Sequence, residues 1–204
     1  MQYLNKMYYG GDTTIKCYNF VNNSEVACPT NKLNAESKAL VDNYTWNTGA
    51  VETATKTDTL SFYQAERGSA NGKMCTSGAE CNDTVVRTTT WTGHIALPYV
   101  TDYVYASGES DCNTKIDQST TYKCKNKNWM HYGSKWLDVM WMLSPSTSSS
   151  HANIAWGVNG DGDVGCYSDM LSLYVFPSIY LKSNVIIESG NGTSDDPYIL
   201  KAGA

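Results

Sequence analysis

The residues that could carry acid–base or nucleophilic chemistry are few and lie far apart along the chain. The three histidines, His94, His131 and His151, are widely separated, and no GxSxG, HExxH, P-loop or GxGxxG motif occurs. We therefore expect His94 and His131 to be surface or core residues. The same role is expected for His151, with ligand contact as the alternative because this residue lies in a serine-rich, exposed stretch. The pattern predicts a protein that is not an enzyme.

A second group with chemical potential is acidic. Asn159, Asp161 and Asp163 alternate as the oxygen ligands of a calcium loop do, but an EF-hand requires glycine where Val164 stands and a bidentate glutamate where Met170 stands. The Asn-Gly and Asp-Gly dipeptides here supply the backbone angles of a tight turn between two alternating strands. We predict a β-hairpin turn, with weak calcium binding as the alternative, and no cofactor or metal site.

The seven cysteines indicate an oxidising compartment. Six of them form three locally spaced pairs in polar stretches: Cys17 with Cys28, Cys75 with Cys81, and Cys112 with Cys124. None has the spacing of metal ligands and no histidine stands near them, so we predict three local disulfides, with cytosolic thiols as the alternative. Cys166 is left over, as a thiol outside any bridge, an intermolecular link or a small buried side chain. Bridges of this kind are typical of extracellular proteins.

The amino-acid composition excludes several classes of protein. The chain has 204 residues, a formal net charge of −5, and only two arginines, Arg67 and Arg87, which makes nucleic-acid binding unfavourable. Six Trp and 15 Tyr argue against disorder. No apolar run of membrane-spanning length occurs, and the first residues, MQYLNKMYYG, do not resemble a signal peptide, so any export signal is expected to have been removed or to lie upstream.

The polar composition is that of a recognition surface. Charged residues are only 17% of the chain, whereas 20 Ser, 21 Thr and 17 Asn accompany the 15 Tyr. Tyrosine offers a large rigid contact with a polar end, and Ser, Gly and Asn adapt around it. Packing on half-buried strands is the alternative and is preferred for Tyr99, Tyr103, Tyr105, Tyr180 and Tyr198. For Tyr167 and Tyr174 both interpretations stay open.

Local patterns predict short helices before a strand-rich C-terminal part. The helices are expected from Asn34, which caps the first, to Gly49; over 60–67, before Gly68; and over 103–106, capped by Thr101 or Asp102. The strands are expected over 95–97, from Met140 to Pro145, in the hairpin around 159–162, over 173–181 and over 184–189, before a terminal extended segment. No linker separates these parts, so one α+β domain over 1–204 is predicted.

The region 129–200 carries a recognisable order of motifs. The matching residues are Trp141, Leu143, Ser144 and Pro145; Ala155, Val158 and Gly162; Val175 and Pro177; and Ser189, Gly190, Gly192, Thr193, Pro197 and Tyr198. This region resembles C-type lectin-like domains of bacterial surface and phage-associated proteins, which are related to the formylglycine-generating, sulfatase-modifying domain. The upstream phrases YLNKMYY, TWNTG, YQAERG and WTGHIALPYVTDYVYA are similar to those of bacterial proteins that begin with a prepilin-type helix.

The resemblance implies a C-type lectin-like fold but not the chemistry of the formylglycine enzymes. Phe176 stands where the family has an arginine that connects the loops of the fold. Phe176 is therefore expected to make an apolar contact or to form part of a binding surface. Cys166 is the only cysteine in the C-terminal region, whereas those enzymes use a redox-active pair. Their oxidase chemistry is therefore not carried over.

The resemblance also suggests a diversity-generating retroelement variable protein. In such proteins adenine-directed mutagenesis rewrites Asn-type codons of the C-terminal hairpin region, and non-Asn residues stand at the following positions here: His151, Ile154, Trp156, Asp161, Asp163, Cys166, Tyr167, Asp169, Leu171, Leu173 and Tyr174. Trp156 cannot arise from an Asn codon by changes of adenine alone and is better explained as scaffold.

These inferences converge on an extracellular or cell-surface binding domain that presents the surface 146–176. The predicted ligand-binding residues are His151, Asn153, Trp156, Asp161, Asp163, Tyr167, Asp169, Leu171, Leu173, Tyr174 and Phe176. The expected partner is a protein or glycan on a cell surface. The alternative is a structural pilin-like head domain in a pilus-like or phage assembly, and a hydrolase or sulfatase-modifying-type enzyme is a third, less favoured, class.

Overall fold

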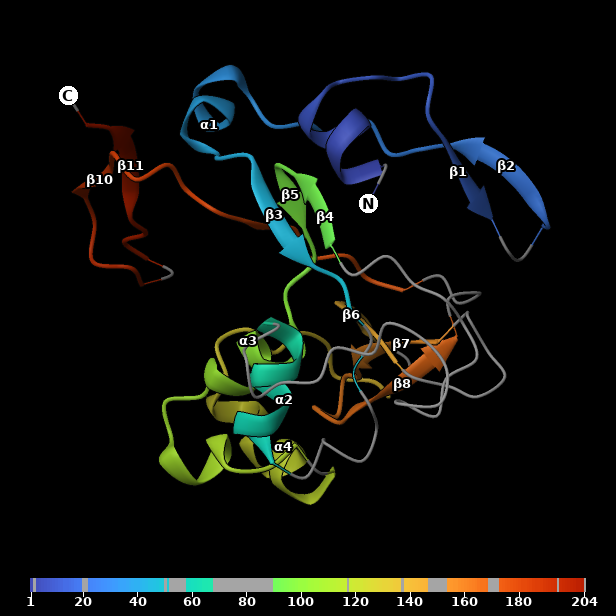
Figure 1. Ribbon diagram of the computed structural model, residues 1–204, viewed down its shortest axis with the longest axis vertical. Helices are drawn as coiled ribbons and strands as arrows, with labels where there is room; N and C mark the ends of the chain where they lie inside the picture. Colours follow the sequence, from blue (N-terminus) through green and yellow to red (C-terminus); the bar gives the residue numbers. More distant parts are fainter. Residues whose placement is uncertain are drawn as a thin grey trace.

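The computed structural model describes residues 1, 3–19, 22–49, 51, 58–67, 90–116, 118–136, 138–146, 154–168, 173–193 and 195–203. Figure 1 shows the strand pair β3 (Tyr44–Asn47) and β4 (Thr90–Gly93) between two groups of elements. One group contains the N-terminal helical turn, α1 and the two outer hairpins. The other contains α2, α3 and α4 beside the three-stranded sheet β6–β8.

The helices are all short. They are η1 (Tyr3–Tyr9, a π-helix), α1 (Ala35–Leu40), α2 (Thr59–Arg67), α3 (Val100–Tyr105), η3 (Ser110–Asn113), α4 (Gln118–Cys124) and η4 (Lys125–Lys127), of which η3 and η4 are 3₁₀ turns. The helix predicted over 60–67 is confirmed as α2. The helix predicted from Asn34 to Gly49 is confirmed only as far as Leu40, and its expected second half is wrong, because residues 44–47 form a β-strand paired with residues 90–93. Helices η1 and α4 were not foreseen. Within the described residues, no helix has both the length and the apolar character needed to cross a membrane.

The caps explain where two of these helices begin. Asn34 Oδ1 accepts a hydrogen bond from the backbone N–H of Ser37 at 2.7 Å, as its residue type predicts. Helix α3 differs from the prediction, because Tyr99 is its N-cap residue. Asp102 occupies the third helical position and accepts from the backbone N–H of Tyr99 at 2.9 Å. The prediction that Thr101 or Asp102 caps this helix is therefore wrong.

The strands form small antiparallel sheets. They are β1 (Lys16–Asn19), β2 (Ser24–Ala27), β3 (Tyr44–Asn47), β4 (Thr90–Gly93), β5 (Ile95–Ala96), β6 (Met140–Pro145), β7 (Ile154–Val158), β8 (Val164–Ser168), β9 (Ser178–Ile179), β10 (Val185–Ser189) and β11 (Ile199–Ala202). The pairs are β1–β2, β3–β4, β5–β9 and β10–β11, and β6–β7–β8 is three-stranded. The chain is thus mixed α and β with small antiparallel sheets and few helices.

The predicted hairpin is confirmed as β7–β8, with Val158 opposite Val164. Its turn is organised by Asn159, whose side-chain Oδ1 accepts from the backbone N–H groups of Asp161 at 3.0 Å and Asp163 at 2.9 Å. Gly162 has a φ of 82°, which favours glycine. These residues form a turn, and among the described residues no cluster of three His, Cys, Asp or Glu side chains could hold a metal ion.

Two apolar clusters hold the molecule together. The larger surrounds Trp156, whose ring packs edge-on against Phe62 at a centroid distance of 5.0 Å and whose Nε1 donates to Val51 O at 3.3 Å. Trp156 is 0% exposed. It is a core residue, so its predicted role as a ligand contact is wrong. The smaller cluster contains Trp46, Ala96, Tyr99 and Leu143.

Two of the predicted disulfides are present, and the third, Cys75 with Cys81, lies outside the described residues. Cys17–Cys28 closes the β1–β2 hairpin, and Cys112–Cys124 joins η3 to the end of α4. Two bridges of this kind favour an oxidising, extracellular environment. Cys166 has an exposed thiol, which lies 3.1 Å from Ser146 Oγ, so the expectation of a buried side chain there is wrong.

Candidate functional site: an aromatic cleft

A buried carboxylate fixes the helix that forms one wall of the site. Glu66, at the end of α2, is 1% exposed. Its Oε1 accepts from the backbone N–H of Val100 at 2.9 Å and from Ser144 Oγ at 2.7 Å. Its Oε2 accepts from the backbone N–H and the hydroxyl of Thr101, at 3.1 Å and 2.5 Å. Burial raises the pKa of Glu66 to about 7, although these four hydrogen bonds favour the charged form.

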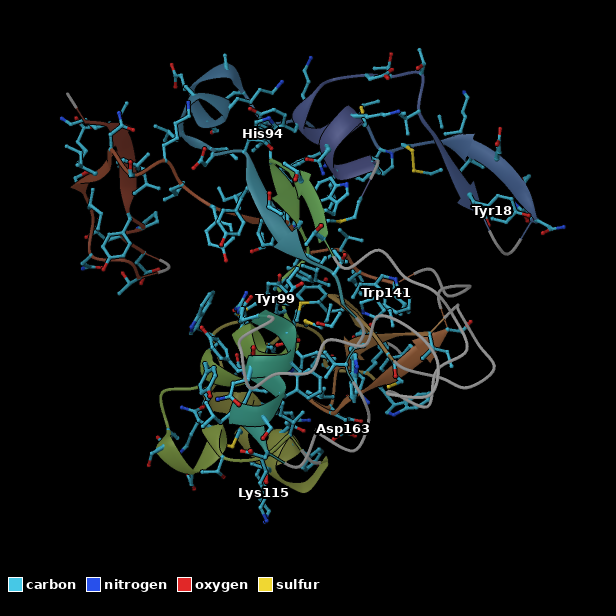
Figure 2. All side chains as sticks on the ribbon, in the orientation of Figure 1. Tyr18, His94, Tyr99, Lys115, Trp141 and Asp163 are labelled. Carbon is cyan, nitrogen blue, oxygen red and sulfur yellow. A yellow bond between two sulfur atoms is a disulfide. The ribbon has the colours of Figure 1, made fainter. Side chains whose placement is uncertain are left out.

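The next residue, Arg67, continues this anchorage toward the site. Its guanidinium forms an ion pair with Asp102 and lies over the ring of Tyr99, 3.9 Å from the centroid. The Tyr99 hydroxyl accepts from the backbone N–H of Asn47 at 2.8 Å and donates to Asn47 O at 2.9 Å. Figure 2 shows Tyr99 where helix α3 meets β3. Helix α3 is thereby attached to both α2 and β3.

Beside this wall lies a cleft of about 740 Å³, within the range of roughly 300–1,000 Å³ typical of small-molecule sites. Its lining comes from four distant parts of the chain: Trp46, the segment 98–106, the segment 129–140 and the segment 176–180. Six large aromatic side chains dominate it. They are Trp46, Tyr105, Trp129, Tyr132, Phe176 and Tyr180.

Trp129 is the most exposed of these side chains, at 81%. The backbone on either side of it is nevertheless held firmly. Asn128 is buried, and its Nδ2 donates to Tyr103 O at 2.6 Å while its Oδ1 accepts from the backbone N–H of Met130 at 2.9 Å. Met130 packs against the larger core cluster. A large apolar ring is therefore displayed to solvent from a fixed loop, beside the exposed rings of Tyr105 and Tyr132, and exposed apolar patches of this kind mark interaction sites.

The ring of Tyr132 forms the next part of the lining. Its centroid lies 5.0 Å from that of Phe176 and 5.0 Å from that of Tyr174, in tilted and edge-on arrangements. His131, between Trp129 and Tyr132, has its Nδ1 3.1 Å from the Tyr103 hydroxyl. Burial, and then the nearby Lys125, lower the pKa of His131, so its imidazole is neutral at neutral pH.

Trp46 and Tyr180, whose ring centroids are 4.7 Å apart, also line the cleft. Trp46 is buried, and within the described part of the chain its indole Nε1 has no hydrogen-bond partner. Asp102 is the acidic member of the described lining, which contains no lysine or arginine. Its Oδ1 pairs with Arg67 and its Oδ2 accepts from Tyr99, so the cleft presents little net charge.

Apart from Trp156, which is a core residue, the predicted ligand-binding residues fall into three groups. His151, Asn153, Asp169 and Leu171 lie outside the described residues. Phe176 lines the cleft, and Tyr174 packs against Tyr132 at its edge. Asp161, Asp163 and Tyr167 belong to the β7–β8 hairpin, and Leu173 precedes Tyr174.

Within the hairpin, two of these residues have structural contacts. Asp161 Oδ1 pairs with Lys125 Nζ at 3.3 Å, and Asp163 is buried. Tyr167 is half-buried beside Gly157 and Gly165. None of the three lines the cleft, so the predicted surface 146–176 contributes its C-terminal end, Phe176, to this site.

Sequence reasoning missed most of the cleft. Tyr105 was expected to be a packing residue, whereas it is exposed and lines the cleft. Tyr180 packs against the smaller core cluster, as expected, and also lines the cleft. The available signal was the run WMHY at 129–132, an aromatic cluster between the polar stretches KNKN and GSK. Such a cluster in a polar loop is more consistent with a binding site than with a core.

Comparison with protein-family models, with curated proteins and with solved structures finds no match to this chain.

Proposed function

We propose that this protein is an exported, non-enzymatic binding domain that holds its ligand in the aromatic cleft. The observation that carries the proposal is the display of Trp129, 81% exposed, from a loop that Asn128 and Met130 immobilise. An exposed tryptophan on rigid backbone loses little conformational entropy when it binds. Aromatic anchors of this kind carry a large share of the energy in known binding sites.

Export and fold are separate parts of the proposal. The disulfides Cys17–Cys28 and Cys112–Cys124 support an extracellular or cell-surface location. The C-type lectin-like classification, in bacterial surface or phage-associated proteins, is supported by the motif order over 129–200. The three-stranded sheet β6–β8 carries the first part of that signature.

Diversification of the C-terminal region is a further part of the proposal. The positions concerned include Asp161 and Tyr167 on the hairpin and Tyr174 at the edge of the cleft. The source locus is expected to contain an adenine-rich template repeat and a reverse-transcriptase gene. A locus that lacks both would contradict this part without affecting the role of the cleft.

A second candidate function is that of a head domain in a pilus-like or phage assembly. The observation in its favour is the β10–β11 hairpin, which exposes Ile186, Ile187, Tyr198 and Ile199. Such a surface is typical of a contact with another protein. An I187E variant that prevents assembly while leaving ligand binding unchanged would support this role in addition to the first.

The proposed function is tested by binding of fluorescently labelled protein to bacterial and epithelial cells, measured by flow cytometry. The W129A variant is expected to lose at least about tenfold in apparent affinity, because it removes the central aromatic contact. W136A is the matched control, since Trp136 is also exposed, at 58%, but does not line the cleft. Equal binding by wild type and W129A to every cell type that the protein binds, or binding to none, would overturn the proposal.

A further inference from the structure

We propose that the ligand in the aromatic cleft is an uncharged carbohydrate, with a sugar ring stacked on the indole of Trp129. This inference rests on the proposed function and specifies its ligand class. It follows from three properties of the cleft, namely its aromatic surfaces, its neutral charge and its size.

The aromatic surfaces fit the apolar face of a sugar. The C–H groups on one face of a pyranose carry partial positive charge, and the face of an aromatic ring is negative, so the two stack favourably. Trp129 offers the largest such ring and is almost fully open to solvent. Tyr132, held by its contacts with Tyr174 and Phe176, offers a second ring on the same segment of chain.

The polar groups at the cleft fit hydroxyls. The rings of Tyr105 and Tyr132 are exposed and carry phenolic oxygens that can both donate and accept hydrogen bonds. His131 contacts the Tyr103 hydroxyl through Nδ1, at 3.1 Å, so it positions this part of the lining rather than offering both ring nitrogens to a ligand. Hydroxyl groups, which are also donors and acceptors, match this mixture.

The charges argue against an ionic ligand. The described lining has no lysine or arginine to pair with a sulfate, phosphate or carboxylate, and the chain carries a net charge of −5. A cationic ligand would find no free carboxylate in the described lining, because that of Asp102 is already paired with Arg67 and bonded to the N–H of Tyr99. An uncharged ligand meets neither obstacle.

The size argues for an oligosaccharide end or a short stretch of glycan rather than a folded protein. A stable protein–protein contact buries roughly 800 Å² per partner over a broad surface. Here the aromatic groups converge on one cleft of about 740 Å³. A ligand of a few rigid rings can fill such a space and leave the backbone around it unchanged.

The first experiment uses an array of neutral, sialylated and sulfated oligosaccharides, followed by calorimetric titration with the neutral hexasaccharides of glucose, mannose, xylose and N-acetylglucosamine. We expect binding to at least one neutral structure, with quenching or a blue shift of tryptophan fluorescence. W129A should weaken that binding about thirtyfold, W129F should retain part of it because it keeps an aromatic face, and W136A should be unchanged. Exclusive binding to sialylated or sulfated structures would overturn the inference.

The second experiment separates the ligand class from the proposed function. Cells that bind the protein are treated either with periodate, which cleaves vicinal diols of sugars, or with a protease. Loss of Trp129-dependent binding after periodate, with survival after protease, supports a carbohydrate. Loss after protease with survival after periodate would refute the carbohydrate and leave the proposed function standing, whereas binding that never depended on Trp129 would refute both.

Discussion

The buried carboxylate of Glu66 is held by Thr101, which donates both its backbone N–H, at 3.1 Å, and its hydroxyl, at 2.5 Å, to the same Oε2 atom. This relationship attaches the end of α2 to the first turn of α3. Helix α3 supplies Asp102 and Tyr105 to the cleft. The position of one cleft wall therefore depends on a side chain that lies outside the cleft.

Removal of the Glu66 carboxylate is expected to destabilise the fold. E66A leaves the N–H groups of Val100 and Thr101 and two hydroxyls without their acceptor, and each such buried group costs about 1–3 kcal/mol. E66Q keeps the volume and one acceptor oxygen, so its loss should be smaller. The free energy of unfolding from urea denaturation measures both. E36Q is the control, because Glu36 is exposed on α1, and a similar loss in E36Q would contradict the argument.

The stability contributed by Glu66 should depend on pH. Its folded pKa is raised from 4.5 to about 7, so the folded state favours the protonated form. The contribution is therefore fully present below pH 4.5 and is lost as the pH rises toward 7, by about 3 kcal/mol in total. We expect the free energy of unfolding of wild type, relative to E66Q, to fall between pH 4.5 and 8. A rise over this interval would mean that the four hydrogen bonds outweigh burial.

Sequence patterns predicted the parts of the molecule that local residues determine. The β7–β8 hairpin followed from Asn-Gly and Asp-Gly between alternating residues, and α1 followed from its Asn34 cap. The predicted start of helix α3 was wrong, because Asp102 is of a residue type that commonly caps helices. Its carboxylate instead bonds back to the N–H of Tyr99, whose hydroxyl is fixed by Asn47 far away in the sequence.

The cleft could not be predicted in the same way. Trp46, Trp129 and Tyr180 come from three separate parts of the chain and meet only when β3, the loop after η4 and the segment after β9 are folded together. Alternation in the sequence correctly placed Trp156 on the hairpin but did not show which face was buried. It lies in the core, while Trp129, in a loop, is exposed.

The two described disulfides should contribute unequally to stability. The double variant C112S/C124S removes a bridge between η3 and α4, with a sequence separation of 12, and should lower the free energy of unfolding by about 2–3 kcal/mol. C17S/C28S affects the β1–β2 hairpin, which is largely exposed, so that hairpin should open locally with little effect on global unfolding. Thermal unfolding measures the difference. Peptide mapping without reductant should recover both disulfide-linked peptide pairs. If all four cysteines were instead recovered as alkylated thiols, the predicted pairing would be contradicted.

Trp129 and Trp156 should respond to the same substitution in opposite ways. W156A removes a fully buried ring that packs on Phe62, and core losses of this size cost about 3–5 kcal/mol. W129A removes a ring that is 81% exposed, so the free energy of unfolding should change by less than about 0.5 kcal/mol. Urea denaturation followed by far-UV circular dichroism measures both changes. If W129A were as destabilising as W156A, the exposed indole of Trp129 would have a structural role. The loss of ligand binding by the W129A variant could then no longer be attributed to the cleft.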